Sequence, residues 1–113
     1  STRAEKSVVE IEKLMPDSAI FTAYSGYRLR YKDAPADYSE VYVYCDDIEE
    51  IKNRFPESKN TPNIFVLRKD RNIGKYGKIA TNSNIFVDLW NLPEWYAGEY
   101  LKAIEQKWNT GIQ

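Results

Sequence analysis

One segment constrains the fold of this chain more than any other, because its apolar side chains point to both sides of an extended backbone. Residues 39–45 are rich in β-branched and aromatic residues, which favour β-structure. Apolar residues occupy both odd and even positions, so neither face of such a strand suits water. A strand of this kind is expected inside a sheet whose two faces are covered by helices.

Helices are predicted on both sides of this strand. Residues 2–15 carry apolar residues at steps of four, three and four, which is the period of an amphipathic helix. Residues 48–55 begin with acidic residues, end with basic ones and are followed by Pro56. This order complements a helix dipole and stops the helix at the proline.

Short apolar runs predict three more strands. They lie at residues 19–22, 63–67 and 79–81. Residues 24–31 can be interpreted in two ways, because their second half alternates as a strand does, whereas Ser25 could cap a short helix. A helix is the interpretation adopted.

The C-terminal part predicts two helices. Residues 84–91 also alternate like a strand, but Ser83 can act as a helix cap and the apolar side chains share one helical face. Pro93 suits the first turn of the second helix. Its apolar stripe consists of Ala97, Leu101, Ile104 and Trp108.

Together these elements predict an α/β (α+β) fold. The expected architecture is a small mixed β-sheet of about four strands flanked by helices, with the N-terminal helix and the C-terminal helix pair packing on the sheet. With 113 residues, of which 42% are hydrophobic, the chain suits one domain that spans residues 1–113.

Composition narrows the possible chemistry. Sixteen basic residues against 17 acidic ones give a net charge of −1, so no general attraction to nucleic acid or membranes is expected. A single cysteine excludes an internal disulfide, and the lack of histidine excludes every Ser/His or Cys/His nucleophilic pair. No apolar run approaches a membrane span. A cytoplasmic protein without a cofactor is expected.

Asp46 and Asp47 follow the central strand, where α/β proteins often place functional groups. Paired carboxylates could hold Mg²⁺ for a nuclease or nucleotidyltransferase-like reaction. The same placement is explained if one aspartate caps the following helix. No third acidic partner can be identified from the spacing.

A basic segment between residues 68 and 78 is the candidate for binding phosphates or a protein partner. Its glycines and charges predict a loop or an exposed hairpin, which could equally be ordinary solvated surface. The candidate binding residues are Arg68, Lys69, Arg71, Lys75, Tyr76 and Lys78.

Aromatic residues could line an interface or the pocket of a small-ligand sensor, but a helical aromatic stripe is more often part of the core. Trp95 lies off the stripe of the last helix and is therefore the candidate interface residue. Asp88 stands among apolar neighbours, and a hydrogen bond to a loop amide is expected for it.

Several segments of the chain occur in a characteristic order. The final part reads KIAT at 78–81, NIFVDLWNLP at 84–93 and AGEYL at 97–101, and upstream lie AIFTAYSG at 19–26 and VYVYCDD at 41–47. This order resembles the C-terminal domain of AbiEi-like regulators, the antitoxins of type IV toxin–antitoxin (abortive infection) systems and related archaeal transcriptional regulators. Asn84 stands where a glutamine is usual in that family.

The resemblance implies a non-catalytic regulatory or interaction domain that follows an N-terminal winged-helix DNA-binding domain. The chain, which starts with Ser1 in place of methionine, would then be a C-terminal fragment of a longer protein. Such a domain would act through self-association, through a toxin protein, or by supporting DNA binding of the full-length protein. No catalytic residue is implied.

Overall fold

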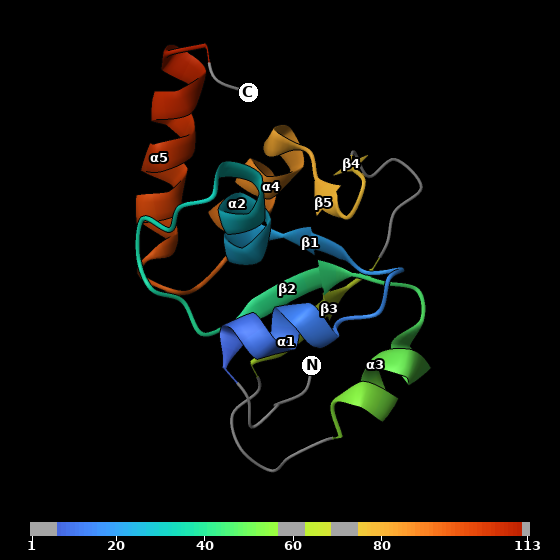
Figure 1. The fold of residues 1–113 in the computed structure, drawn as a ribbon. Helices are drawn as coiled ribbons and strands as arrows, with labels where there is room; N and C mark the ends of the chain where they lie inside the picture. Colours follow the sequence, from blue (N-terminus) through green and yellow to red (C-terminus); the bar gives the residue numbers. More distant parts are fainter. Residues whose placement is uncertain (1–6, 57–62, 69–74, 112–113) are drawn as a thin grey trace.

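The computed structural model describes residues 7–56, 63–68 and 75–111 of the chain (Figure 1). The helices in these residues are α1 (Val8–Leu14), α2 (Ala23–Tyr31), α3 (Ile48–Arg54), α4 (Asn82–Trp90) and α5 (Ala97–Asn109). The strands are β1 (Ile20–Thr22), β2 (Val41–Tyr44), β3 (Ile64–Leu67), β4 (Lys75–Tyr76) and β5 (Ile79–Ala80).

The strands form one mixed sheet in the order β3-β2-β1-β5-β4. β2 is parallel to β3 and antiparallel to β1, while β1 is parallel to β5 and β5 is antiparallel to β4. The α+β fold with a mixed sheet flanked by helices is therefore confirmed. The fifth strand is β4, a two-residue piece of the expected hairpin.

Helices cover both faces of the sheet (Figure 1). The side chains of β2 alternate between them: Val41 and Val43 point toward α1 and α3, whereas Tyr42 and Tyr44 point toward the layer of α2 and α4. The alternation explains why residues 39–45 carry apolar side chains at both parities. The strand predicted to be covered on both faces is confirmed as an inner strand.

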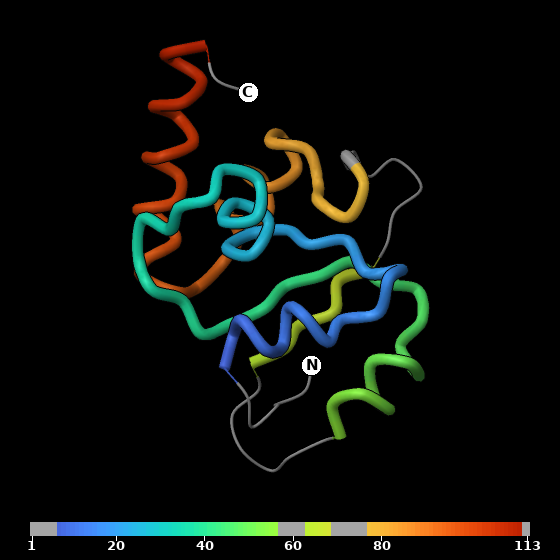
Figure 2. Tube along the Cα trace, in the orientation of Figure 1, coloured from blue at the N-terminus to red at the C-terminus, as the bar shows by residue number. Residues whose placement is uncertain are grey.

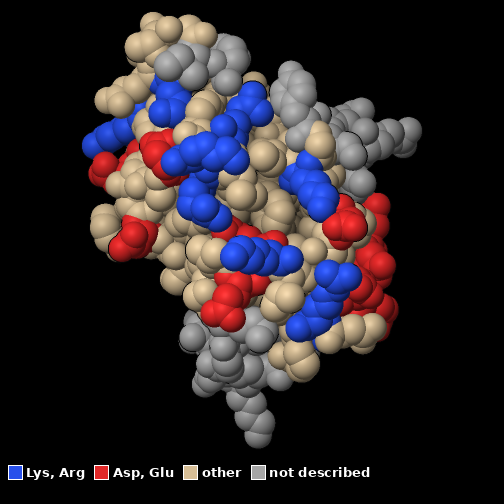
Figure 3. All heavy atoms as spheres, viewed as in Figure 1, with Lys and Arg blue, Asp and Glu red and all other residues tan. Residues whose placement is uncertain are grey.

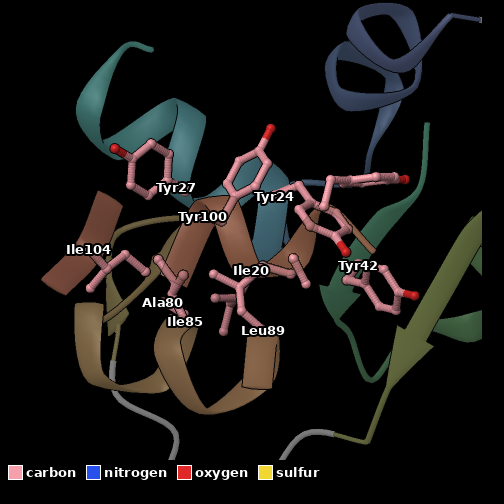
Figure 4. Packing of buried hydrophobic residues seen from close by; sticks show 12 residues of the cluster. Ile20, Tyr24, Tyr27, Tyr42, Ala80, Ile85, Leu89, Tyr100 and Ile104 are labelled. Atoms are coloured by element: carbon pink, nitrogen blue, oxygen red, sulfur yellow. The ribbon is translucent and has the colours of Figure 1, made fainter. Parts of the chain in front are cut away.

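The core is correspondingly divided into two clusters. The cluster under α1 and α3 consists of Ile11, Met15, Ala19, Phe21, Val41, Val43, Cys45, Ile51, Phe55 and Ile64. The cluster on the opposite face is built from aliphatic residues of β1, β5, α4 and α5 together with buried tyrosines (Figure 4). Figure 4 labels among them Ile20, Tyr24, Tyr27, Tyr42, Ala80, Ile85, Leu89, Tyr100 and Ile104.

The C-terminal helix pair forms the outer part of this second layer. α4 contacts β1 and α2, and α5 packs mainly on α4. The connection between α2 and β2 runs past the first turns of α5 (Figure 2), where the Tyr100 hydroxyl donates a hydrogen bond to the carbonyl of Ala36. No helix in the described part of the chain is long and apolar enough to cross a membrane.

The helix starts differ in detail from the predicted ones. α1 is capped by Ser7, whose hydroxyl accepts from the amide of Glu10; residues 2–6 of the predicted helix lie outside the described residues. The helix predicted over residues 24–31 is confirmed and begins one residue earlier. α4 begins before the predicted cap, because the hydroxyl of Thr81, and not that of Ser83, accepts from the amide of Asn84.

Candidate functional site

Among the described residues, the most exposed large hydrophobic side chain belongs to Trp95, which is 82% exposed. It lies in the connection between α4 and α5, residues 91–96, referred to below as the Trp95 segment. Two neighbours on α4 are also exposed, Trp90 at 69% and Val87 at 57%. Exposed apolar side chains that gather at one corner of a fold are typical of interaction surfaces.

The Trp95 segment is fixed to the core on both sides of the tryptophan. On one side, the carboxylate of Glu94 accepts hydrogen bonds from the hydroxyls of Tyr24 (2.9 Å) and Tyr42 (3.1 Å). On the other side, the Tyr96 hydroxyl donates to Glu40. Hydroxyls on α2 and β2 and a carboxylate next to β2 therefore hold the segment, and Trp95 projects from a braced backbone.

A cluster of tyrosines surrounds these anchors. Tyr24 lies at its centre, with its ring centroid 4.9 to 6.1 Å from those of four other tyrosines. These four are Tyr38, Tyr42, Tyr96 and Tyr100. The rings meet in stacked and edge-on arrangements, which aromatic pairs favour. The cluster makes the platform beneath the Trp95 segment rigid.

Burial and neighbouring carboxylates hold these hydroxyls in the protonated, hydrogen-donating form. Burial, followed by the hydrogen bond to Glu94, raises the pKa of Tyr24 far above its ordinary value. Burial also raises the pKa of Tyr96 to about 12, with a further contribution from Glu40. The pKa of Tyr42 is raised by burial and by Glu94. The hydroxyls consequently remain donors throughout the neutral range.

The surface of α4 carries almost no charge. Its only charged residue is Asp88. The Asp88 carboxylate accepts hydrogen bonds from the hydroxyls of Thr22 (2.6 Å) and Tyr44 (2.8 Å) on the sheet. It also accepts one from the side-chain amide of Asn84 (3.1 Å). The prediction that Asp88 bonds to a loop amide is therefore wrong. Thr22 precedes α2 at the cap position, but its hydroxyl bonds to Asp88 and makes no cap hydrogen bond.

Aromatic side chains continue this surface across α4 to α5. The ring of Phe86 lies 6.3 Å from that of Trp90 and 5.1 Å from that of Trp108, measured between centroids. Trp90 was expected on the core face of its helix with Ile85 and Leu89, and this expectation is wrong, since Ile85 and Leu89 are fully buried and Trp90 is not. At 3.6 residues per turn, Trp90 lies on the same face of α4 as the exposed Ser83 and Val87, and not on the face of Ile85 and Leu89.

The predicted basic segment is only partly described. Lys69 and Arg71 lie outside the described residues, and of Lys75 and Tyr76 only the backbone, as strand β4, is described. Arg68 is exposed. Lys78 forms an ion pair with Asp17 at 2.8 Å, in which both side chains are largely exposed.

Charges are unevenly distributed on the visible face of the molecule. In Figure 3, acidic side chains gather at the lower right, where α3 lies, and basic side chains are more frequent over the upper half. The acidic residues of this region are Asp46, Asp47, Glu49 and Glu50, and the basic residues of α2 are Arg28 and Arg30.

Asp47 is the cap of α3, and its carboxylate accepts from the amide of Glu50 at 3.1 Å. The capping interpretation is therefore confirmed for Asp47. Asp46 is exposed. Residues 7–56, 63–68 and 75–111 contain no group of three or more carboxylate or thiol side chains that could hold a metal ion.

One buried polar network was not predicted. Glu12 on α1 is 8% exposed, and its carboxylate pairs with Arg28 and accepts hydrogen bonds from Ser25 (2.5 Å) and Tyr38 (2.6 Å). Three donors compensate the loss of water around this charge. A glutamate beside the apolar Ile11 in a helical pattern was the available signal. Its partners come from α2 and the α2–β2 connection, which no local pattern connects to α1.

The geometry provides a braced Trp95 segment and, next to it in the chain, an α4 surface without an exposed charged residue. The predicted aspartates and the described basic residues lie on other elements. Comparisons of the chain with protein-family models, with curated proteins and with solved structures find no match in any of the three.

Proposed function

We propose that this chain is a non-catalytic regulatory domain that associates with a second copy of itself through the surface of α4 and the Trp95 segment. The setting proposed for it is a transcriptional regulator or antitoxin of the AbiEi-like type, which its segments resemble. The observation that carries the proposal is the 82% exposure of Trp95 on a segment fixed by Glu94 and Tyr96.

Rigidity supports an interaction role for Trp95. Binding costs less conformational entropy when the contacting side chain is already held in place. Tryptophan is also enriched among the residues that dominate binding energy in protein interfaces. A tryptophan on a mobile loop would lack the first of these advantages. The hydrogen bonds of Glu94 to Tyr24 and Tyr42 supply this preorganisation.

The lack of free charge supports a second copy as the partner. In a two-fold dimer every surface residue meets a copy of the same patch, so exposed charges near the axis would repel each other. The exposed residues of α4 are Ser83, Val87 and Trp90, and Asp88 is engaged with the sheet. In a chain with 29% charged residues, such a neutral surface suits self-association better than binding to DNA.

Sedimentation velocity of the wild-type chain and of a Trp90→Ala/Trp95→Ala variant tests the proposal. We expect the wild type to change from monomer to dimer as its concentration rises through the micromolar range, about 1–100 μM. The variant should remain a monomer over the same range, because both exposed tryptophans are lost. Circular dichroism should show an unchanged fold, since neither side chain is part of the core.

Leu14→Ala is the matched control. Leu14 is an exposed apolar residue on α1, at 42%, on the other side of the sheet. We expect this variant to dimerise as the wild type does. A wild-type chain that is monomeric up to about 100 μM would contradict the proposal. A double variant that dimerises like the wild type would contradict it equally.

A further inference from the structure

A cavity of about 300 Å³ lies where strands β2 and β3 end. It is lined by Cys45, Asp46, Ile48, Val66, Leu67 and Arg68. β2 and β3 are parallel and paired as far as Tyr44 and Leu67. The residues that follow the two strands therefore leave the sheet at the same end. Cavities at the carboxyl ends of parallel strands are the usual ligand sites of α/β folds.

Two opposite charges share the wall of this cavity without pairing. Asp46 follows β2 and Arg68 follows β3, and both side chains are exposed. Neither side chain forms an ion pair or a hydrogen bond with any residue in the described part of the chain. Both charges are therefore available to a ligand.

The rest of the wall is apolar. Ile48, the first residue of α3, is 49% exposed although it is aliphatic, and it lines the cavity together with Val66 and Leu67. The core therefore leaves Ile48 half uncovered. A ligand that fills the cavity would cover it and gain the free energy of burying apolar surface.

We propose that this cavity binds a small zwitterion with an apolar side chain, that is, an aliphatic α-amino acid. The ligand's ammonium group pairs with Asp46, its carboxylate with Arg68, and its side chain lies on Ile48, Val66 and Leu67. The volume is at the lower end of the range of small-molecule pockets, about 300–1,000 Å³, which suits a ligand of this size. The domain would thus sense an amino acid at a site separate from its dimer surface.

The charges near the cavity argue against a phosphate ligand. Asp47 and Glu49 stand beside Asp46 at the start of α3, so the single Arg68 is outnumbered by carboxylates. A group with two negative charges would be repelled by this set. The carboxylates attract the ammonium group of an amino acid, and the single carboxylate of that ligand pairs with Arg68.

Isothermal titration calorimetry with L-leucine, L-isoleucine and L-methionine tests the site in the wild-type chain, at concentrations up to about 10 mM. We expect saturable binding of at least one of them at one site per chain. Two leucine analogues act as probes of the charges: 4-methylpentanoate lacks the ammonium group and 3-methylbutylamine lacks the carboxylate. Each analogue should bind about tenfold more weakly or worse.

Variants link the binding to the two charges. Asp46→Asn and Arg68→Met should each weaken amino-acid binding about tenfold or more, because each leaves one charge of the ligand unpaired. Glu105→Gln on α5 and Lys52→Met on α3 are the matched controls, since neither residue lines the cavity. These two variants should bind as the wild type does. All four side chains are exposed, and thermal melting checks that the fold is retained.

The proposal is overturned if none of the three amino acids binds saturably. It is also overturned if the analogues with one charge bind as tightly as leucine, or if Asp46→Asn and Arg68→Met bind like the wild type. These results are independent of dimerisation. The Trp90→Ala/Trp95→Ala variant, which should remain monomeric, is expected to keep its affinity for the amino acid.

Discussion

Thr22 and Asp88 lie 66 residues apart in the chain, and the Thr22 hydroxyl donates a 2.6 Å hydrogen bond to the Asp88 carboxylate. Tyr44 donates to the same carboxylate from the neighbouring strand. Through this one side chain α4 is fastened to two strands of the sheet. The attachment has a second consequence: it removes the only charge of α4 from the exposed surface on which Trp90 lies.

Asp88→Ala should lower the free energy of unfolding by about 2–3 kcal/mol, because two hydroxyls lose their acceptor, and the Thr22 hydroxyl is buried away from water. Asp88→Asn retains one acceptor oxygen, so its free energy of unfolding should lie between those of the wild type and Asp88→Ala. Urea denaturation measures the change. Asp37→Ala, at an exposed position, is the control and should change stability by no more than about 0.5 kcal/mol. An equal effect of Asp37→Ala and Asp88→Ala would refute the fastening role.

Alkaline pH should destabilise the fold through the tyrosine cluster. Tyrosines in the unfolded chain ionise near pH 10, whereas burial raises the pKa of Tyr38 and Tyr96 to about 12 in the folded state. Between these values the unfolded state binds fewer protons than the folded one, so the free energy of unfolding falls as pH rises. Below about pH 10 the stabilisation is fully present.

Absorbance at the tyrosinate band, followed together with circular dichroism, checks this. The buried tyrosines should ionise only as the circular dichroism signal of the fold is lost. Ionisation of every tyrosine near pH 10, with the fold intact, would be the contrary result.

Lys32→Gly should stabilise the protein. Lys32 ends α2 in the left-handed conformation, with a φ of 64°, which glycine adopts without steric cost. Relief of this strain should raise the free energy of unfolding by about 0.5–1 kcal/mol in thermal or urea denaturation. Lys13→Gly, inside α1, is the control and should lower stability by about 1 kcal/mol. A loss of stability in Lys32→Gly would contradict the proposed origin of the strain.

Gly26→Ala should destabilise the contact between α2 and α4. A methyl group at this position would lie 3.1 Å from Cδ1 of Ile85 and 3.1 Å from the carbonyl oxygen of Phe21. The flexible Ile85 side chain can move but the backbone oxygen cannot, so we expect a loss of about 1–3 kcal/mol. Gly98→Ala on α5 has open space around it and should stabilise its helix by up to about 1 kcal/mol. Similar effects of the two substitutions would argue against the close approach.

The central strand and most helices could be predicted because their signals are local. The two-sided pattern of residues 39–45 and the aspartate that caps α3 depend on neighbours within a few residues. The position of Trp90 was mispredicted although its helical phase was available. At 3.6 residues per turn Trp90 shares a face with Ser83 and Val87, and not with Ile85 and Leu89, and that face is exposed.

The polar partners were even less predictable. Asp88 and Glu94 find tyrosine and threonine hydroxyls that lie between 44 and 70 residues away, and nothing in the sequence around either residue indicates them. Trp95 was predicted to be exposed because it lies off the stripe of α5, and it is. The bracing that makes it a strong candidate for an interface emerges only from the folded chain.

Fluorescence of Trp95 itself is the most direct test of self-association. In a Trp90→Phe/Trp108→Phe variant Trp95 is the only tryptophan, and its emission reports whether water surrounds it. If two copies meet at the Trp95 segment, the emission maximum should shift to shorter wavelength as the concentration rises, in parallel with the dimer fraction measured by sedimentation. An emission maximum that stays at the wavelength of a water-exposed tryptophan, while sedimentation shows the variant to be a dimer, would contradict the proposed dimer surface.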